Sequence, residues 1–121
     1  MNINIETKDK HTIRSYSNSE IMVGDDIYKS SLIISKETII SLWQINLIKD
    51  LDLSKLEPIL NLNPEVIIIG HEAKGIMISM QIMEYLSKKR IGIECMTIGA
   101  ASRTFNVLLS EDRSVVAGFI W

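Results

Sequence analysis

The chain has 121 residues, 46% of them hydrophobic and 23% charged, which suits one globular domain with a real core and excludes intrinsic disorder. Its 13 basic and 15 acidic side chains give a formal net charge of -2, so no overall positive field favours a nucleic-acid partner. The single cysteine cannot form an internal disulfide, so a reducing compartment is expected.

The N-terminal residues 1–9 are polar and include acidic side chains, unlike a signal peptide or an arginine-rich transit peptide. The apolar runs along the chain, such as residues 66–69, are far shorter than the roughly 20 residues that a membrane-spanning helix needs. These features predict a cytoplasmic protein without direct insertion into a membrane.

The first third of the chain alternates between β-prone segments and turn residues. Residues 12–16, 20–23 and 27–34 are rich in β-formers, and Gly24 opens a turn before the last of these segments. This pattern predicts a meander of antiparallel strands, and residues 38–43 predict a further β-branched strand.

A short helix is expected to begin near Ser54. Asp52 and Ser54 precede an apolar set, and Ser54 and Glu57 have the spacing of a capping box, so Ser54 is predicted to cap the helix. Pro58 would then lie in the first turn, where its missing N–H costs nothing, and Pro64 would end the helix.

Strands and helices alternate in the second half of the chain. Residues 65–70 form an apolar run typical of a central strand buried on both faces. Apolar positions at helical spacing predict a helix over 79–90, followed by a strand over 91–96. A short helix over 103–110 and a last strand over 114–121 complete an α/β domain with a mixed sheet, residues 1–121 forming a single domain.

The last strand contains Phe119, Ile120 and Trp121, which would be unusually apolar at an exposed sheet edge. Burial of this strand against a partner or in a homo-oligomer is therefore left open.

Two loops follow the carboxyl ends of predicted parallel strands, where open α/β sheets bind ligands. The first contains His71 and Glu72, an acid–base pair only if their side chains meet; the alternative is a loop histidine without a catalytic role. Ile76 and Met77 stand where a P-loop requires Lys and Ser or Thr, so this loop is not a P-loop.

The second loop leads into the helix predicted at 103–110. Gly99 lets the backbone pass close to another group, Ser102 is placed to cap the helix, and Arg103 beside that N-terminus suits a carboxylate or phosphate. The alternative is structural: the small residues pack under the sheet, Arg103 pairs with a nearby carboxylate or carbonyl, and Asn106 hydrogen-bonds a loop.

The sequence predicts no catalytic set, no cofactor and no metal site. Only His11 and His71 are available for a Ser/His/Asp triad, and no Cys/His cluster supplies four zinc ligands. Cys95 alternates with Met96 inside a strand, which favours a buried, inert thiol over a nucleophile.

Residues 91–96 and 99–109, followed by Glu111 and Arg113, carry a specific resemblance, and weaker agreement covers nearly the whole chain. The pattern resembles the family of small α/β domains without assigned enzymatic activity that includes the mitochondrial complex I (NADH dehydrogenase) assembly factor 3. The resemblance implies a three-layer fold around a mixed five-stranded sheet with one antiparallel strand, plus an N-terminal β-hairpin region. Mitochondrial members carry a targeting extension and help to build complex I with a partner assembly factor; this chain looks like a bacterial relative.

Departures from the family bear on function. Relatives often have an Asp-Thr pair at Thr97-Ile98 and a cysteine at Ser102, and the loss of this acid and this thiol argues against an enzyme that depends on them. The family commonly has Gly-Thr-Gly where this chain has Gly70-His71-Glu72. The candidate surface for a ligand or a partner combines the matching positions with their neighbours: Gly70, His71, Gly99, Ser102, Arg103, Thr104 and Asn106.

Two functions follow from these residues. The first is a non-enzymatic interaction module that binds another protein through the surface around Arg103 and Asn106, in the assembly of a respiratory or other membrane complex. The second is a small-ligand domain or enzyme that holds an anionic group at the helix start after Gly99, with His71 or Glu72 as acid or base.

Overall fold

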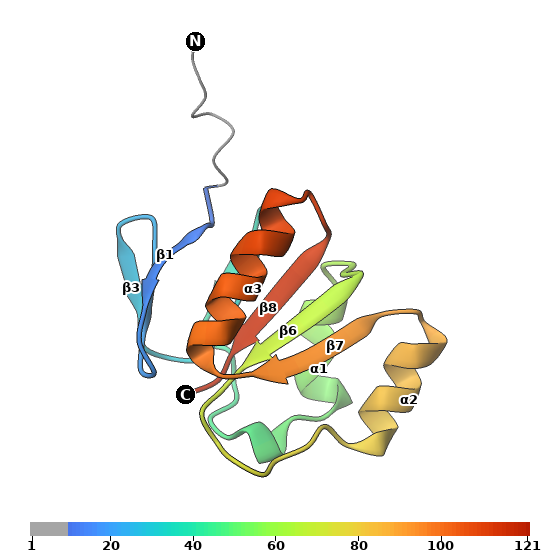
Figure 1. The fold of residues 1–121 in the computed structure, drawn as a ribbon. Coiled ribbons are helices and arrows are strands. Elements are labelled where there is room, and N and C mark those ends of the chain that lie inside the picture. Colours follow the sequence, from blue (N-terminus) through green and yellow to red (C-terminus); the bar gives the residue numbers. More distant parts are fainter. Residues whose placement is uncertain (1–9) are drawn as a thin grey trace.

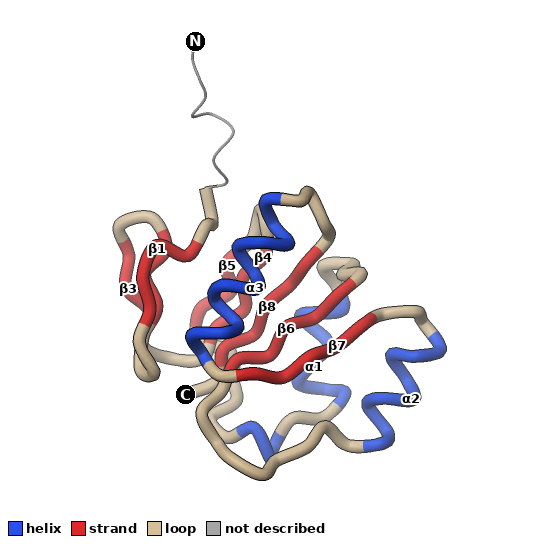
Figure 2. The backbone as a smooth tube through the Cα atoms, viewed as in Figure 1, coloured by secondary structure: helices blue, strands red, loops and turns tan. Residues whose placement is uncertain are grey.

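A five-stranded sheet lies between two other layers in the computed structural model, which describes residues 10–121 (Figures 1 and 2). Its order is β5-β4-β8-β6-β7. Strands β6, β7 and β8 are mutually parallel, whereas β4 is antiparallel to both of its neighbours. The mixed sheet with one antiparallel strand is therefore confirmed. The strands are β4 (Leu32–Ser35), β5 (Ile39–Ser41), β6 (Val66–Gly70), β7 (Gly92–Met96) and β8 (Val115–Phe119).

A separate antiparallel sheet of order β1-β2-β3 precedes it, formed by β1 (Ile13–Tyr16), β2 (Ile21–Val23) and β3 (Asp26–Tyr28). The turn between β2 and β3 contains Gly24 at a φ of 60°, a conformation that glycine adopts without strain. The β-hairpin region is confirmed, but the segment 27–34 is divided between β3 and β4 and does not form one strand. The interpretation of residues 1–9 as unlike a signal peptide lies outside the described residues.

The two faces of the five-stranded sheet are covered by different elements (Figure 2). Helix α3 (Ile98–Ser110) and the N-terminal sheet cover one face; α1 (Leu53–Leu60), α2 (Met80–Lys88) and the 3-10 turn η2 (Ile48–Asp50) cover the other. Within β6, Ile68 packs into the first core, whereas Ile67 and Ile69 pack into the second. The apolar run of this strand thus reflects burial on both faces.

Helix α1 begins earlier than predicted, and its cap is Asp52. The Asp52 carboxylate accepts hydrogen bonds from the Ser54 hydroxyl at 2.7 Å and from the Lys55 N–H at 2.9 Å, and both lower the pKa of Asp52. The prediction that Ser54 caps the helix is wrong: Asp52 is the cap, where its negative charge also suits the positive helix end, and Ser54 lies inside the helix. Pro58 consequently lies inside the helix, beyond its first turn.

Helix α3 begins at Ile98, five residues before the predicted start at 103. Thr97 is its cap, accepting a hydrogen bond from the Ala100 N–H at 3.3 Å. The prediction that Ser102 caps the helix is wrong: Ser102 is fully buried within it and donates its hydroxyl to the Ile98 carbonyl at 2.8 Å. Gly99 is helical despite its low propensity because the helix packs there against the Tyr16 ring.

Strand β8 is the middle strand of the sheet, not an exposed edge strand. It pairs with β4 on one side and β6 on the other, and Phe119 and Ile120 are buried within the chain itself. The apolar end of this segment therefore needs no partner to cover it. Across residues 10–121, no helix has the length and apolar character required to cross a membrane.

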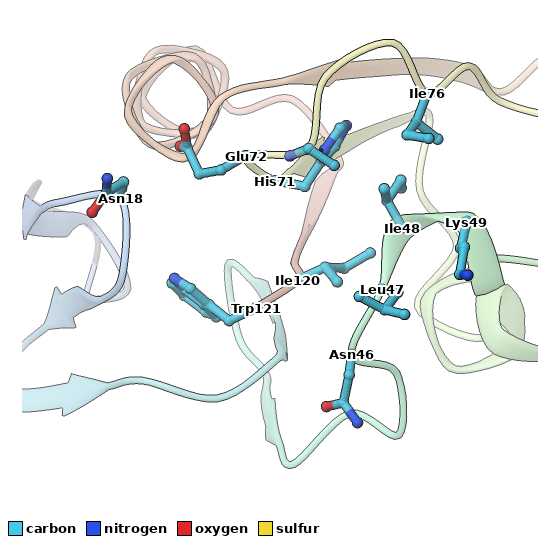
Figure 3. A pocket seen from close by; sticks show the side chains of 11 residues that line it. Asn18, Asn46, Leu47, Ile48, Lys49, His71, Glu72, Ile76, Ile120 and Trp121 are labelled. Carbon is cyan, nitrogen blue, oxygen red and sulfur yellow. Dashed lines mark hydrogen bonds between the residues drawn. The ribbon is translucent and has the colours of Figure 1, made fainter.

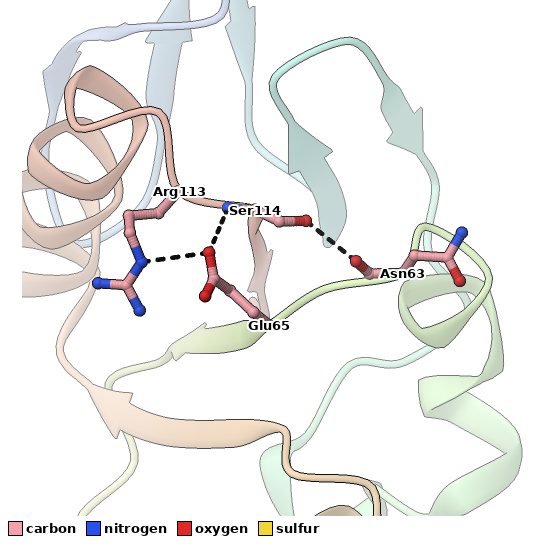
Figure 4. Close-up of polar contacts among 4 residues, drawn as sticks. All are labelled: Asn63, Glu65, Arg113 and Ser114. Atoms are coloured by element: carbon pink, nitrogen blue, oxygen red, sulfur yellow. Dashed lines mark hydrogen bonds and ion pairs between the residues drawn. The ribbon is translucent and has the colours of Figure 1, made fainter.

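Polar contacts close the edge where β6 and β8 begin (Figure 4). The Glu65 carboxylate accepts hydrogen bonds from the Ser114 N–H at 2.9 Å and from Arg113 Nε at 3.2 Å. The Ser114 hydroxyl donates to the Asn63 carbonyl at 3.0 Å. We call this side of the sheet the amino edge.

Candidate functional site

The two candidate loops meet at the opposite side of the sheet, which we call the carboxyl edge because β6, β7 and β8 end there. The His71 N–H donates to the Met96 carbonyl at 3.0 Å, continuing the pairing of β6 with β7. One residue later, the Glu72 carboxylate accepts a hydrogen bond from the Ile98 N–H at 2.9 Å. The structure therefore places the 70–72 segment directly against the start of α3.

The start of α3 is held by groups of the chain itself. The Ile98 N–H donates to Glu72 and the Ala100 N–H donates to Thr97, so two of the free donors of the first turn already have acceptors. A carboxylate at this end of a helix also interacts favourably with the helix dipole. The position that sequence reasoning assigned to an anionic ligand is thus occupied by the Glu72 side chain.

Arg103 lies on the exposed side of α3 and contacts Tyr16 of β1. Its guanidinium donates to the Tyr16 hydroxyl at 2.8 Å and lies 5.8 Å from the centre of the ring. Gly99 is part of the same contact, since a Cβ at that position would lie 3.1 Å from the Tyr16 ring. The expected carboxylate or carbonyl partner of Arg103 is therefore replaced by a phenol, and the guanidinium remains exposed.

Asn106 joins α3 to β1 through both ends of its amide. Its oxygen accepts from the Ile13 N–H at 2.8 Å, and its nitrogen donates to the Ile13 carbonyl at 2.9 Å. Thr104, two residues earlier on α3, is half-buried. The structural alternative for Asn106 was a hydrogen bond to a loop; its partner is instead Ile13, in strand β1.

A pocket of about 280 Å³ opens at the carboxyl edge (Figure 3). In this view Trp121 and Asn18 lie on one side, with Leu47 and Ile76 on the other. The residues that line it come from the segments that follow β1, β5, β6 and β8: Asn18, Asn46, Leu47, Ile48, Lys49, His71, Glu72, Ala73, Ile76, Ile120 and Trp121. Sequence reasoning identified His71 and Glu72 but missed the rest, because segments so far apart in the chain carry no local signal of their meeting.

His71 forms part of the pocket wall. Its Nδ1 accepts a hydrogen bond from the Ala73 N–H at 3.1 Å, which places the proton of the neutral ring on Nε2. Burial lowers the pKa of His71, although the neighbouring Glu72 acts in the opposite direction. The imidazole is therefore neutral at neutral pH, and its Nδ1 is already engaged by the backbone.

Trp121 is anchored by its backbone and its ring. The Ser31 hydroxyl accepts from the Trp121 N–H at 3.0 Å and donates to the Trp121 carbonyl at 3.4 Å. The indole stacks on Phe119, with ring centres 5.9 Å apart. Its Nε1 is buried and has no hydrogen-bond acceptor among residues 10–121.

Two of the side chains that line the pocket are apolar and exposed, and a third exposed apolar side chain follows one of them in the chain. Leu47 is 52% exposed and Ile76 39%, and the adjacent Met77 is 89% exposed. We call these three side chains the apolar rim. Such a grouping beside a pocket is typical of a surface that another molecule covers.

Other reactive groups of the described chain lie elsewhere or are unreactive. Burial raises the pKa of the Cys95 thiol to about 11, so this cysteine is protonated at neutral pH, as expected of an inert thiol. Within residues 10–121, no group of three or more His, Cys, Asp or Glu side chains is placed to hold a metal ion.

The fold and the pocket define a class of protein: a small three-layer α/β domain with a mixed five-stranded sheet, a second three-stranded sheet and a pocket where the parallel strands end. The chain belongs to the family described as "Protein of unknown function (DUF498/DUF598)", whose model matches residues 13–120.

Individual relatives share much of this domain. The NMR structure of a Xanthomonas campestris protein is 30% identical, with a TM-score of 0.82, covering 89% of this chain and 82% of that one. The "13 kDa major membrane protein" of Francisella tularensis subsp. holarctica is 27% identical over 103 residues, 84% of either chain. The "NADH dehydrogenase [ubiquinone] 1 alpha subcomplex assembly factor 3" of Xenopus tropicalis is 27% identical over 111 residues. That alignment covers 89% of this chain and 60% of the Xenopus protein.

Proposed function

We propose that this protein is a non-enzymatic, assembly-factor-like module that binds another protein at its carboxyl edge. The observation that carries the proposal is the pocket with its apolar rim, since exposed Leu47, Ile76 and Met77 bury apolar area only when a partner covers them. Methionine suits such a surface because its flexible thioether adapts to different neighbours.

The exposed guanidinium of Arg103 extends this surface beyond the pocket. It lies on the first turns of α3, whose start is bonded to the pocket residue Glu72. Arginine is enriched in protein interfaces, where its planar group forms several directed hydrogen bonds. In this proposal Gly70, Gly99, Ser102 and Thr104 shape the support beneath the surface, and Asn106 holds β1 in place.

The finer proposal concerns the partner and the compartment. The Xenopus relative is named as an assembly factor of NADH dehydrogenase, and the Francisella relative is named as a membrane protein. We propose by analogy a cytoplasmic bacterial protein whose partner is a protein of a respiratory or other membrane complex under assembly.

An affinity capture from native cell extract tests the proposal with a matched pair of variants. Leu47→Asp places a charge on the apolar rim, whereas Val107→Asp places the same charge on α3 at a nearly equal exposure, 54% against 52%. A specific protein should be captured by the wild type and by Val107→Asp, and its recovery should fall about tenfold or more with Leu47→Asp.

Arg103→Ala should weaken the same capture less, since it removes one polar contact at the border of the surface. Thermal unfolding of each variant establishes that the fold is retained. Equal capture by the Leu47→Asp and Val107→Asp variants would refute the carboxyl edge as the binding surface.

A further inference from the structure

The imidazole of His71 presents a hydrogen-bond donor to the pocket. The residue is only 8% exposed, and its Nδ1 accepts from the Ala73 N–H, so the proton of the neutral ring is on Nε2. Nε2 forms no hydrogen bond within residues 10–121, yet it is not closed off from solvent as Trp121 Nε1 is. Because His71 lines the pocket, the accessible side of this donor faces the pocket. An occupant can therefore accept a hydrogen bond from His71 without a movement of the ring.

Two charged side chains line the pocket, and their surroundings differ. The Glu72 carboxylate accepts from the Ile98 N–H at the start of α3, where the helix dipole compensates part of its charge. The Lys49 ammonium forms no ion pair in the described part of the chain. In Figure 3 the Glu72 carboxylate lies towards α3, whereas Lys49 lies at the other end of the pocket, on the side of Ile76. A negative group at that end would be attracted by Lys49 more than it is repelled by Glu72.

The size and the walls of the pocket limit the rest of the occupant. About 280 Å³ is the volume of roughly nine waters in the liquid, which leaves room for about ten non-hydrogen atoms. The walls include the apolar side chains of Leu47, Ile76 and Ile120. Apolar walls with a few polar groups are typical of sites for small ligands, in which the polar groups orient the ligand.

We propose that this pocket binds a carboxylate joined to one medium-sized apolar group, with His71 Nε2 donating a hydrogen bond to the carboxylate and the Lys49 ammonium balancing its charge. A carboxylate is favoured over a neutral carbonyl because a charged acceptor forms the stronger hydrogen bond. The C-terminal residue of a polypeptide and a free small acid share this chemistry. The inference goes beyond the proposed function, since the apolar rim can bind a partner whether or not the pocket is occupied.

NMR titration of the ¹⁵N-labelled full chain tests the inference, because the chain has two histidines and long-range ¹H–¹⁵N spectra resolve their ring nitrogens. The first probe is N-acetyl-L-leucine, which carries a carboxylate beside an apolar side chain. The His71 Nε2 resonance should shift and saturate, with a dissociation constant on the order of 1 mM. The His11 ring should not respond, since its Nδ1 lies 2.7 Å from the Ser35 carbonyl, outside the pocket.

Two further probes separate the charge from the apolar group. N-acetyl-L-leucinamide keeps the side chain without the negative charge, and acetate keeps the charge without the side chain. Each should bind about fivefold more weakly than N-acetyl-L-leucine, or weaker still.

A matched pair of lysine variants tests the assigned counter-charge. Lys49→Gln should weaken binding of N-acetyl-L-leucine by about twofold to fivefold and leave that of the amide unchanged. Lys88→Gln makes the same change in net charge on α2, outside the pocket, and should leave both probes unaffected. Both lysines are exposed, so neither substitution disturbs the core.

Four outcomes would overturn the inference: an unmoved His71 Nε2 resonance, equal binding of N-acetyl-L-leucine and its amide, acetate binding as tight as that of N-acetyl-L-leucine, or equal effects of the two lysine substitutions. Hexanoate and N-acetyl-Ala-Ala-Leu then distinguish the sources, since tighter binding of the tripeptide assigns the pocket to a polypeptide C-terminus and tighter binding of hexanoate to a free acid. A partner lost with Leu47→Asp but an unmoved His71 would retain the proposed function and reject this pocket chemistry.

Discussion

The amino edge and the carboxyl edge of the sheet contain similar polar groups, but these groups have different surroundings. At each edge a glutamate carboxylate accepts a backbone N–H from a distant segment: Glu65 from Ser114 at the amino edge, and Glu72 from Ile98 at the carboxyl edge. Around Glu65, hydrogen bonds link the segments to one another (Figure 4). Around Glu72 there is a pocket, an apolar rim and an indole donor that has no acceptor in the described part of the chain.

This difference teaches where to look for function in a domain without a catalytic motif. A carboxylate on a backbone N–H is a structural device that occurs at both edges, so it does not by itself indicate a ligand site. The carboxyl edge differs in two respects: it exposes apolar side chains to solvent, and it contains a buried indole N–H that has no acceptor among residues 10–121. The exposed apolar area would be buried by a molecule that covers it.

The largest expected difference between the edges comes from a pair of glycines. At the carboxyl edge, a Cβ on Gly70 would lie 2.9 Å from both Ala101 and Phe119, whereas at the amino edge a Cβ on Gly92 meets nothing closer than 3.8 Å. Gly70→Ala should destabilise the protein by about 1–3 kcal/mol through overpacking. Gly92→Ala should be neutral or slightly stabilising.

Chemical denaturation of the two glycine variants measures this difference. Equal stabilities would show that the start of α3 yields to the added methyl group, and that the carboxyl edge is less tightly packed than its contacts with Phe119 indicate.

A pair of serines gives a smaller difference. Ser31→Ala should cost about 1–2 kcal/mol, because it leaves the Trp121 N–H without its acceptor at a buried position. Ser114→Ala removes only an exposed hydroxyl, which donates to the Asn63 carbonyl, and should cost no more than about 0.5 kcal/mol.

The effects of the two serine substitutions are measured from the midpoints of unfolding and from the fluorescence of Trp121. Only Ser31→Ala should also alter the indole emission, since Ser31 positions that residue. A larger loss of stability in Ser114→Ala would reverse the comparison.

The smallest effect is a pH dependence at the amino edge. The hydrogen bond from Ser114 and then the contact with Arg113 lower the pKa of Glu65 below its ordinary value of 4.5. A carboxyl with a lowered folded-state pKa stabilises the fold above its unfolded pKa, and this stabilisation is lost as the pH falls through the folded value. The wild type should therefore be more stable than Glu65→Gln at pH 6, and the difference should shrink towards pH 3.

Denaturation curves at several pH values give this measurement, with Glu84→Gln as a control for the same change in net charge. A difference between wild type and Glu65→Gln that is constant from pH 6 to pH 3 would contradict the assigned role of the Glu65 carboxylate.

Local patterns predicted much of the fold. The apolar run 65–70 became β6, and the helical spacing over 79–90 became α2 with Ser79 as its cap. The start of α3 was missed because Gly99, a poor helix former, was interpreted as part of a loop; in the structure Gly99 is helical and packs against Tyr16. Tertiary contact outweighed local propensity there.

The site was predictable only where its residues are close in sequence. His71 and Glu72 follow an obvious strand, so their place at its carboxyl end could be inferred. Leu47 and Trp121 lie near these residues because of the strand order, in which β8 lies beside β6. No local sequence pattern predicts that order. The apolar end of β8 was interpreted as an exposed edge for the same reason: its neighbours come from segments far earlier in the chain.

The position of β8 also governs the order in which the chain can assemble during synthesis. Before residues 115–119 leave the ribosome, the strands of this sheet can form at most two incomplete halves, the β4–β5 hairpin and the parallel pair β6–β7. Each half then exposes an unpaired strand edge that invites association with other chains. Insertion of β8 closes both edges in one step, so a nascent chain halted before residue 115 is where aggregation or chaperone capture is expected to concentrate.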